Sequence, residues 1–497
     1  MQKLQGECFI DNITIVNHDN LAIDLSLVTS NIQLFESIDQ PLVSGRISIV
    51  DSLELIKNYK IVGQESLSIT IRARDDSEIS GFTLKKNSIN RVFRVYSITD
   101  EHTLDERNTK TYVLHFIDPK YFLINQVRLS KVMFGSYSDM LLKEWRELCF
   151  KNKEEPANLT EHWEKSKPAN KQLVCPDWTL FELIDYVKAS AQSKETDSPF
   201  ENDLFFFDTV FGGVNRFMSL AKMITLSNPL IFDTFPRIDL YDALIDDDTR
   251  LMDKPYEGLN VQILDYTRPQ RANLIEAIYE GLYSSNLTSY DSVRKIDKVI
   301  NYDSKKVYDK FDGLNPMVNL DEPEKVTQVS AINSETVEIS TRTYETLSIN
   351  EPLAGGLSFD RINPTNIYSN SKQLVDSTSS ENEQEFTSRE FKDDSLCKRN
   401  SLMSLLEQFK MNVTIPFRRD ITAGTVITLA LPQMDTLLDN TDDMTSDELD
   451  NGEYLITRVN YNIEPMKNQG LIHLQCVKVG FDTDLKKYDP LSKVIKS

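Results

Sequence analysis

The chain has 497 residues, of which 40% are hydrophobic, 9% aromatic and 27% charged. This is the composition of an ordinary globular protein, and at roughly 150 residues per domain the length predicts about three or four domains. The 77 acidic residues exceed the 55 lysines and arginines by 22. Because lysine and arginine supply most of the affinity for phosphates, this charge argues against a nucleic-acid binder and against binding to an anionic membrane surface.

The longest apolar runs, at residues 204–207 and 426–431, are far shorter than the roughly 20 residues that cross a bilayer. The first seven residues lack the apolar segment of a secretory signal. We therefore expect no membrane insertion and no signal peptide. The five cysteines are far apart and odd in number, so we expect free, buried thiols in a reducing compartment.

Motifs for catalysis or cofactor binding are missing. The chain lacks the glycine-rich phosphate loop, the dinucleotide-binding glycine pattern, H-E-x-x-H and G-x-S-x-G. Its five histidines are scattered, and His115 and His473 lie within alternating strand patterns, where a structural role is more common than metal ligation. A carboxylate pair for glycoside hydrolysis stays open, because 77 acids offer many pairs and no pattern selects one. We predict a non-enzyme, without catalytic, cofactor-binding or metal-binding residues and without a cofactor.

Two acidic clusters have a plainer interpretation as solvated loops. Asp246-Asp247-Asp248 is one, and residues 435–453 are the other, with eight acids and no lysine or arginine. A calcium loop needs its oxygens at fixed spacing with a glycine at the sharp turn, and Gly452 comes only after most of the second cluster. A self-repelling loop is therefore expected there.

Residues 1–120 are expected to be β. Residues 67–73 alternate between apolar and polar, the period of a half-buried strand, and residues 47–51 do the same. Residues 91–98 and 111–117 predict two more strands, joined across the polar stretch 99–110. Several strands without a comparable helix predict a small barrel or sandwich.

Residues 121–254 predict an α+β domain. The apolar residues between Met140 and Cys149 share one face of a helix that begins near Ser138. Thr179-Leu180-Phe181-Glu182 fits a capping box, which opens a second helix. Residues 204–209 and 215–220 predict two strands with a tight turn at Gly212-Gly213.

Aromatic residues in this domain leave two interpretations open. Trp178 and Phe205-Phe206-Phe207 could form a ligand platform, but core packing is the more common role of such residues.

Residues 255–302 return to an alternating β pattern, with a turn at residues 266–271. Residues 273–283 predict the returning strand, although their alanine and glutamate content also allows a helix. Residues 303–389 are an insertion, in which the Ser-, Asn-, Thr- and Glu-rich stretch 366–385 predicts a mobile loop or linker.

Residues 390–485 have a clear pattern again. The expected elements are a helix at residues 402–409, a strand at 411–415, a turn at Gly424 into a strand that ends at Pro432, and a hairpin of residues 454–463 and 471–477. Residues 486–497 predict a frayed C-terminal tail.

The expected fold is thus mainly β with α+β parts. Two small barrels, one at residues 1–120 and one at 255–302 plus 390–485, are combined with the α+β domain at 121–254 and the polar insertion at 303–389.

Several segments, in this order, resemble the baseplate central hub protein of contractile-tailed, T-even-like bacteriophages. They are L-F-E-S-I at 34–38, S-G-R-I-S-I-V-D-S at 44–52 and V-G-Q-E-S-L at 62–67 in the first barrel, P-D-W-T-L-F-E at 176–182 in the middle domain, and residues 389–409, A-G-T-V-I at 423–427 and G-E-Y-L-I at 452–456 in the second barrel. The resemblance covers residues 1–300 and 390–485. Residues 303–389 are longer than this family leads us to expect.

The resemblance implies a tail-tube-like fold for both barrels and a homotrimer. Three chains with two tube-like barrels each would match a sixfold tail tube on one side and a threefold spike on the other. The implied partners are the central spike protein, the tail tube or tube-initiator protein, and also the tape-measure and baseplate wedge proteins. The protein would be assembled in the host cytoplasm, initiate the tube in the virion baseplate and let genome DNA pass without specific binding. Since negative charges repel phosphate, we expect the lumen-facing strand surfaces to be acidic or neutral.

Other classes stay open. A tail-associated, carbohydrate-binding adhesin would use the aromatic-rich residues 178–217, and a cell-wall hydrolase would need a carboxylate pair that no motif identifies. The equivalent hub of a non-contractile tail or of an injection machine would share the same fold.

Overall fold

The computed structural model describes residues 6, 8–73, 89–104, 109–150, 159–167, 171–195, 203–211, 213, 215–226, 230–233, 262–270, 273–282, 284–291, 296–303, 326–329, 336–339, 365–370, 395–431 and 450–478. The chain divides into two compact units. The first comprises Met1–Asp197, Asp203–Pro269 and Lys410–Val477, and the second comprises Ser198–Asn202, Gln270–Phe409 and Lys478–Ser497.

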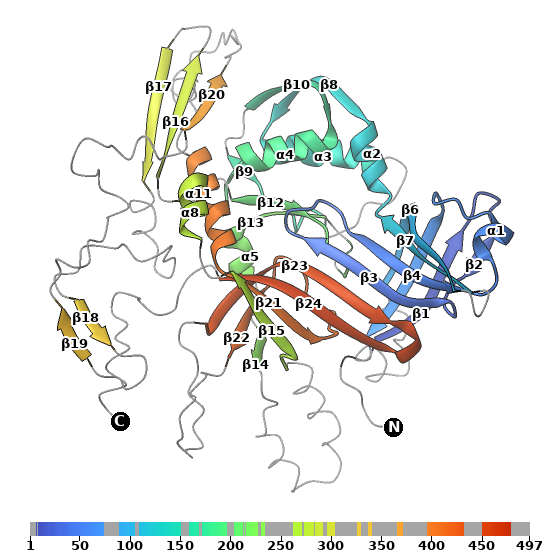
Figure 1. Ribbon diagram of the computed structural model, residues 1–497. Helices are drawn as coiled ribbons and strands as arrows, with labels where there is room; N and C mark the ends of the chain where they lie inside the picture. Colours follow the sequence, from blue (N-terminus) through green and yellow to red (C-terminus); the bar gives the residue numbers. More distant parts are fainter. Residues whose placement is uncertain are drawn as a thin grey trace, which may run out of the picture. The chain divides into compact units, whose positions relative to one another are not determined.

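The first unit is built on a 13-stranded sheet (Figure 1). Its strands are β1 (Cys8–Val16), β2 (Ala22–Asp24), β3 (Thr29–Ser37), β4 (Ser44–Asp51), β5 (Ser66–Ala73), β6 (Ile89–Leu104), β7 (Thr109–Ile117), β14 (Leu230–Asp233), β15 (Asp265–Gln270), β21 (Lys410–Pro416), β22 (Val426–Ala430), β23 (Gly452–Glu464) and β24 (Gln469–Lys478). The order is β15-β21-β24-β23-β3-β4-β7-β6-β5-β1-β2, with β22 paired to β23 and β14 parallel to β22. The mainly β class is confirmed.

One strand pair joins the two ends of the sequence. Strand β23 runs antiparallel to β3, from Arg458 opposite Ser37 to Ile463 opposite Ile32 (Figure 1). The described strands of the two halves therefore share one continuous sheet, instead of forming two separately closed barrels. The start of β1 also contacts the turn between β23 and β24, where Cys8 N–H donates to the carbonyl of Asn468, next to the 3-10 turn η4 (Pro465–Lys467).

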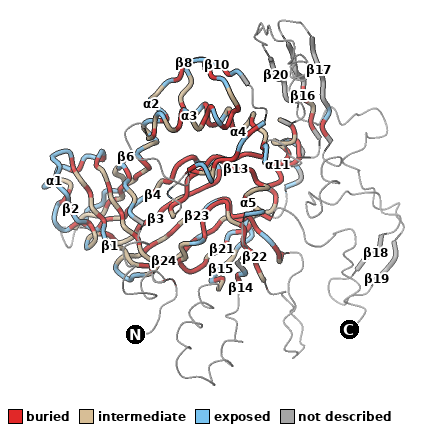
Figure 2. Tube along the Cα trace, turned by 180° about the vertical axis from the view of Figure 1, so that it is seen from behind, coloured by how far each residue is buried: buried red, intermediate tan, exposed pale blue. Residues whose placement is uncertain are grey.

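Alternating side chains give the sheet a core face and an outer face. Strand β4 shows the period of two, with Ile47, Ile49 and Asp51 buried between more exposed neighbours. Figure 2 shows buried positions running along β3, β4 and β23. The large buried rings of Phe93, Phe116 and Tyr461 belong to this core.

The middle of the chain adds helices and small sheets to the first unit. These elements are α2 (Lys120–Gln126), β8 (Arg128–Gly135), α3 (Tyr137–Cys149), β9 (Ser166–Lys167), β10 (Lys171–Thr179), α4 (Leu180–Ser190), β11 (Gln192–Ser193), β12 (Leu204–Phe207), β13 (Arg216–Ser219) and α5 (Leu220–Leu226). Helix α3 begins after its N-cap Ser136, and the capping box of Thr179 and Glu182 opens α4, as predicted. Trp145 packs edge-on against Phe206, with ring centroids 5.0 Å apart.

The second unit contains α8 (Leu274–Glu280), α11 (Ser395–Gln408) and a three-stranded sheet of β16 (Ser284–Asp291), β17 (Ile296–Asp303) and β20 (Thr365–Asn370). It also contains the hairpin of β18 (Val326–Val329) and β19 (Thr336–Ile339). Ser401 of α11 donates to the carbonyl of Leu282, two residues after the end of α8, and this buried hydrogen bond connects the two helices.

Several local predictions were wrong. Residues 266–270, expected to turn, lie in β15. Among the described strands β15 pairs only with β21, which leaves an outer edge where Pro269 is tolerated. Residues 274–280 are helix α8, the alternative that their composition allowed. Residues 366–370 belong to β20 and not to a loop. Helix α1 (Leu55–Tyr59), helix α2 and the β8–β10 sheet had not been predicted.

Other predictions lie outside the described residues. These are Asp246-Asp247-Asp248, the acidic stretch 435–449, Gly212, residues 371–385 and the tail 486–497. Every helix in the described part of the chain is too short or too polar to span a bilayer.

Candidate functional site: the two faces of the central sheet

The outer face of the central strands is largely polar. We define the polar face by its half-buried or exposed residues on six adjacent strands: Asn412 and Thr414 on β21; His473 and Gln475 on β24; Arg458, Asn460 and Asn462 on β23; Asn31, Gln33 and Phe35 on β3; Arg46 and Ser48 on β4; Val113 and His115 on β7. Among these residues the charges are Arg46 and Arg458, and Arg458 lies 3.8 Å from the carboxylate of Asp39, which follows β3. Glu464, the next outward residue on β23, is paired to Lys467.

Register places these side chains beside one another across the strands. Asn460 lies opposite Phe35, and Asn462 lies opposite Gln33. Asn31 Nδ2 donates to Asn462 Oδ1 at 2.7 Å. Arg46 Nε donates to Gln33 Oε1 at 2.6 Å. The Asn31–Asn462 bond therefore carries the polar face across the β3–β23 joint.

The core face of the same joint holds a buried carboxyl group. Glu36 of β3 is 2% exposed. Its Oε2 accepts from the Val210 N–H at 2.6 Å, and its Oε1 accepts from the Ala423 N–H at 2.6 Å. Tyr461 Oη lies 3.0 Å from Oε1. Glu36 thus binds β3 to three other parts of the first unit: the segment after β12, the turn before β22, and β23.

Burial raises the pKa of Glu36 to about 7, against the lowering effect of these hydrogen bonds and of the Arg216 charge. Burying an unpaired carboxylate costs free energy, so this environment favours the neutral form of Glu36. Phe211, Phe417 and Tyr461 complete the junction as an aromatic cluster with centroids 5.2–6.2 Å apart.

A second buried group of charges lies next to this junction. Arg91 of β6 donates to Asp208 Oδ2 at 2.6 Å, to Asp118 Oδ2 at 3.1 Å and to the carbonyl of Thr209 at 2.7 Å. Burial lowers the pKa of Arg91, but Asp208 and Asp118 outweigh it and raise the pKa above the ordinary value. Arg91 and Glu36 together fix residues 208–210 against the core face.

The histidines singled out from the sequence both hydrogen-bond across strands. His115 pairs with Thr99 at 2.9 Å, and His473 pairs with Thr414 at 3.0 Å. The five cysteines are free and buried, which confirms that expectation.

The aromatic run lies in the core. Phe205, Phe206 and Phe207 are at most 1% exposed, so they offer no ligand platform. Trp178 is half-buried against Tyr186, with centroids 4.9 Å apart. For Phe205, Phe206 and Phe207 the structure thus supports core packing, the second of the two interpretations.

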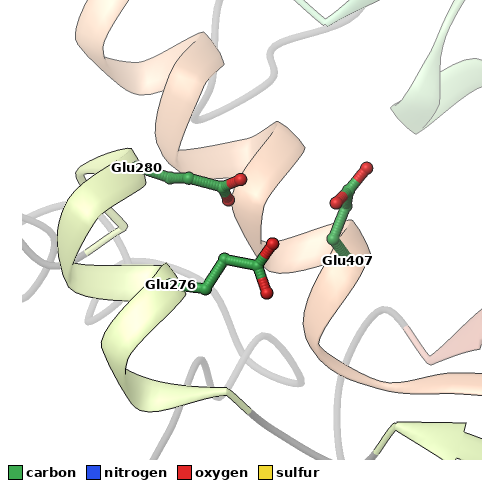
Figure 3. Close-up of side chains that lie close together, drawn as sticks. All are labelled: Glu276, Glu280 and Glu407. Carbon is green, nitrogen blue, oxygen red and sulfur yellow. The ribbon is translucent and has the colours of Figure 1, made fainter.

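Three exposed glutamates meet in the second unit. Glu276 and Glu280 of α8 and Glu407 of α11 each place a carboxylate oxygen within 4.8 Å of the others (Figure 3). Asn273 Nδ2 donates to Glu276 at 2.9 Å. Exposed acidic groups often cluster without a metal, and no further ligand from the described residues joins this cluster. We therefore do not assign it as a metal centre.

Sequence analysis missed Glu36, although the signal was present. With a period of two, Ile32, Leu34, Glu36 and Ile38 share one side of the chain, and all four are buried. An acid in the buried phase of a strand pattern therefore indicates an internal polar junction.

Comparisons with known proteins give only weak likenesses. No family model and no curated protein matches the chain. A tail protein from Neisseria meningitidis superposes with a TM-score of 0.44 at 9% identity, covering 94% of this chain and 96% of that one. A prophage tail protein from Shewanella oneidensis gives 0.41 at 9% identity, covering 94% and 98%. A chain of a Francisella PdpA–VgrG complex gives 0.36 at 11% identity, covering 97% and 60%. These likenesses assign no function to this chain.

Proposed function

We propose that the chain is a structural protein of a phage-type tail, three copies of which form a ring that adapts a sixfold tube to a threefold spike. The observation that carries the proposal is the polar face, which crosses the β3–β23 joint without an acidic residue in a chain of net charge −22. The ordered resemblance of the sequence to hub proteins supports the same role.

The polar face has the chemistry that a DNA conduit needs. A dense set of lysines and arginines would retain phosphate, so a lumen is expected to be acidic or neutral. Amides and hydroxyls supply the neutral alternative. Two arginines per chain, Arg46 and Arg458, would give six around a threefold ring, and Asp39 is paired to Arg458. The polar face would then line the lumen, with the acidic residues of the chain elsewhere.

The remaining roles are those that the resemblance to hub proteins implies. The ring would initiate tube assembly and contact the central spike, the tube or its initiator, the tape measure and the baseplate wedges. It would act in the virion baseplate after assembly in the host cytoplasm, and it would need no cofactor and catalyse no reaction. A non-contractile tail or an injection machine would use the same ring.

Mass measurement and negative-stain imaging of the purified chain, alone and with a candidate spike, test the proposal. We expect trimers with a central hole. We also expect duplex DNA at physiological salt to show no measurable binding to the ring. Monomers in both samples would contradict the ring, and tight DNA binding would contradict the conduit.

A further inference from the structure

Hydrogens can be counted at the buried Glu36 junction. Tyr461 Oη lies 2.8 Å from the carbonyl oxygen of Ile421 and 3.0 Å from Glu36 Oε1. Both of these oxygens are acceptors when Glu36 is ionised. A tyrosine hydroxyl has one hydrogen, so it can donate to only one of them. The other contact would then bring two buried oxygens together without a hydrogen.

One added proton completes the chain of hydrogen bonds. A neutral Glu36 donates from Oε1 to Tyr461 Oη, and Tyr461 donates to the carbonyl of Ile421. The N–H groups of Ala423 and Val210 still find acceptors, since a carboxylic acid keeps lone pairs on both oxygens. A proton on Oε2 would instead face the Val210 N–H, which is itself a donor.

We propose that Glu36 carries a proton in the folded protein and that this proton closes a pH-sensitive latch between β3, residues 208–211 and residues 421–423. Loss of the proton leaves an acceptor without a hydrogen and an anion in the core. The latch is therefore strongest on the acid side of neutrality. This inference does not depend on the proposed tail function.

The charges around the latch agree with this assignment. Burial raises the pKa of Glu36 to about 7. Burial, followed by the Glu36 charge, raises the pKa of Tyr461 well above its ordinary value, so the extra hydrogen belongs to Glu36. Arg216 of β13 is the cation that opposes protonation, and burial lowers its own pKa. The charge of Asp208 acts against this lowering of the Arg216 pKa, and the charge of Asp420 adds to the rise in the pKa of Tyr461.

A second buried glutamate supplies a matched control. Glu164 is 0% exposed and accepts from the hydroxyls of Ser193 and Ser219 and from the Ser219 N–H. The two hydroxyls in turn accept from backbone N–H groups, of Glu195 and Lys222. Each of these hydrogen bonds has its own donor hydrogen, which distinguishes them from the contacts of Tyr461 at the Glu36 junction.

The sign of the pH effect follows from linkage. The pKa of Glu36 rises from the ordinary 4.5 in the unfolded chain to about 7 in the folded protein, so the folded state holds the proton more tightly. The stabilisation is fully present below pH 4.5 and is lost as the pH rises to about 7. For one proton, the unfolding equilibrium constant rises up to tenfold per pH unit within this window.

Urea unfolding of the full chain from about pH 5 to about pH 8 tests the latch. We compare the wild type with Glu36→Gln and Glu164→Gln, and use the ratio of unfolding constants to cancel the shared titrations. The ratio of wild type to Glu36→Gln should rise steeply up to about pH 7 and then level off. Glu164→Gln, in which the Glu36 junction is intact, controls for the loss of a buried glutamate as such. A flat ratio for Glu36→Gln would overturn the proposal.

In Glu36→Gln an amide NH2 would face a backbone N–H, and this contact could prevent folding. Infrared difference spectroscopy of the wild type tests the proposal without that variant. Exposed carboxyl groups are ionised well below neutral pH. We expect one carboxylic-acid C=O band to persist at pH values where exposed carboxyl groups are ionised, and to disappear with a midpoint near pH 7. Glu36→Asp should shift the frequency of this band. The absence of any such band would overturn the proposal.

Discussion

The two faces of the central sheet differ in what their polar groups contact. On the core face, Glu36 and Arg91 bond to chain segments more than 100 residues away, and removing either leaves partners buried. On the polar face, Gln33, Arg46 and Asn462 bond within the sheet and keep contact with solvent. The core face therefore determines whether the first unit holds together. The residues of the polar face matter less for folding, so they can suit the molecules that this face contacts.

Arg91→Ala tests the core face with the largest expected effect. It would leave Asp208 and Asp118 buried without their cation, and we expect a loss of ~3–5 kcal/mol in the free energy of unfolding. Arg46→Ala on the polar face is the control, with a change within ~0.5 kcal/mol in urea unfolding. Equal losses would erase the distinction between the two faces.

Gly45→Ala probes packing on the core face. An added Cβ would lie 2.5 Å from the carbonyl oxygen of Gln33 and would also strike the Phe116 ring. We expect a loss of ~1–3 kcal/mol, measured by thermal and urea unfolding. Ser48→Ala, on the polar face of the same strand, should unfold nearly like the wild type. A stable Gly45→Ala protein would show that the core face can adjust.

Acids introduced on the polar face should have little effect on folding. Gln33→Glu combined with Asn460→Asp should change the free energy of unfolding by less than ~1 kcal/mol. In tail particles that carry this variant, we expect a changed rate of DNA release, because the added charges repel phosphate. Gln64→Glu with Gln126→Glu, which adds the same two charges at exposed positions outside the polar face, controls for altered net charge. Unchanged release would place the lumen elsewhere.

Thiol labelling gives the smallest perturbation. The native cysteines are buried, so Asn412→Cys on the polar face would present the reactive thiol. We expect this thiol to react with a small maleimide in the monomer and also in the assembled ring, with the folding unchanged. Protection on assembly would show that the polar face is a contact between subunits instead.

Sequence patterns predicted the pieces of this structure better than their connections. Periodicity located α3, the capping box of α4 and the β23–β24 hairpin, since these depend on neighbouring residues. The β3–β23 pairing joins residues more than 400 apart, and no local pattern encodes it. Strand β15 was missed because Pro269 signals a turn unless the strand is known to lie at an edge. The polar face could not be predicted either, because it exists only once β21, β24 and β23 lie beside β3.

The most direct test of the proposed function is imaging of the purified chain, with an electron-dense maleimide label on Asn412→Cys. We predict threefold rings with a central hole and with the label on the wall of the hole. Compact monomers, or rings labelled on their outer surface, would contradict the proposal that the polar face lines a conduit.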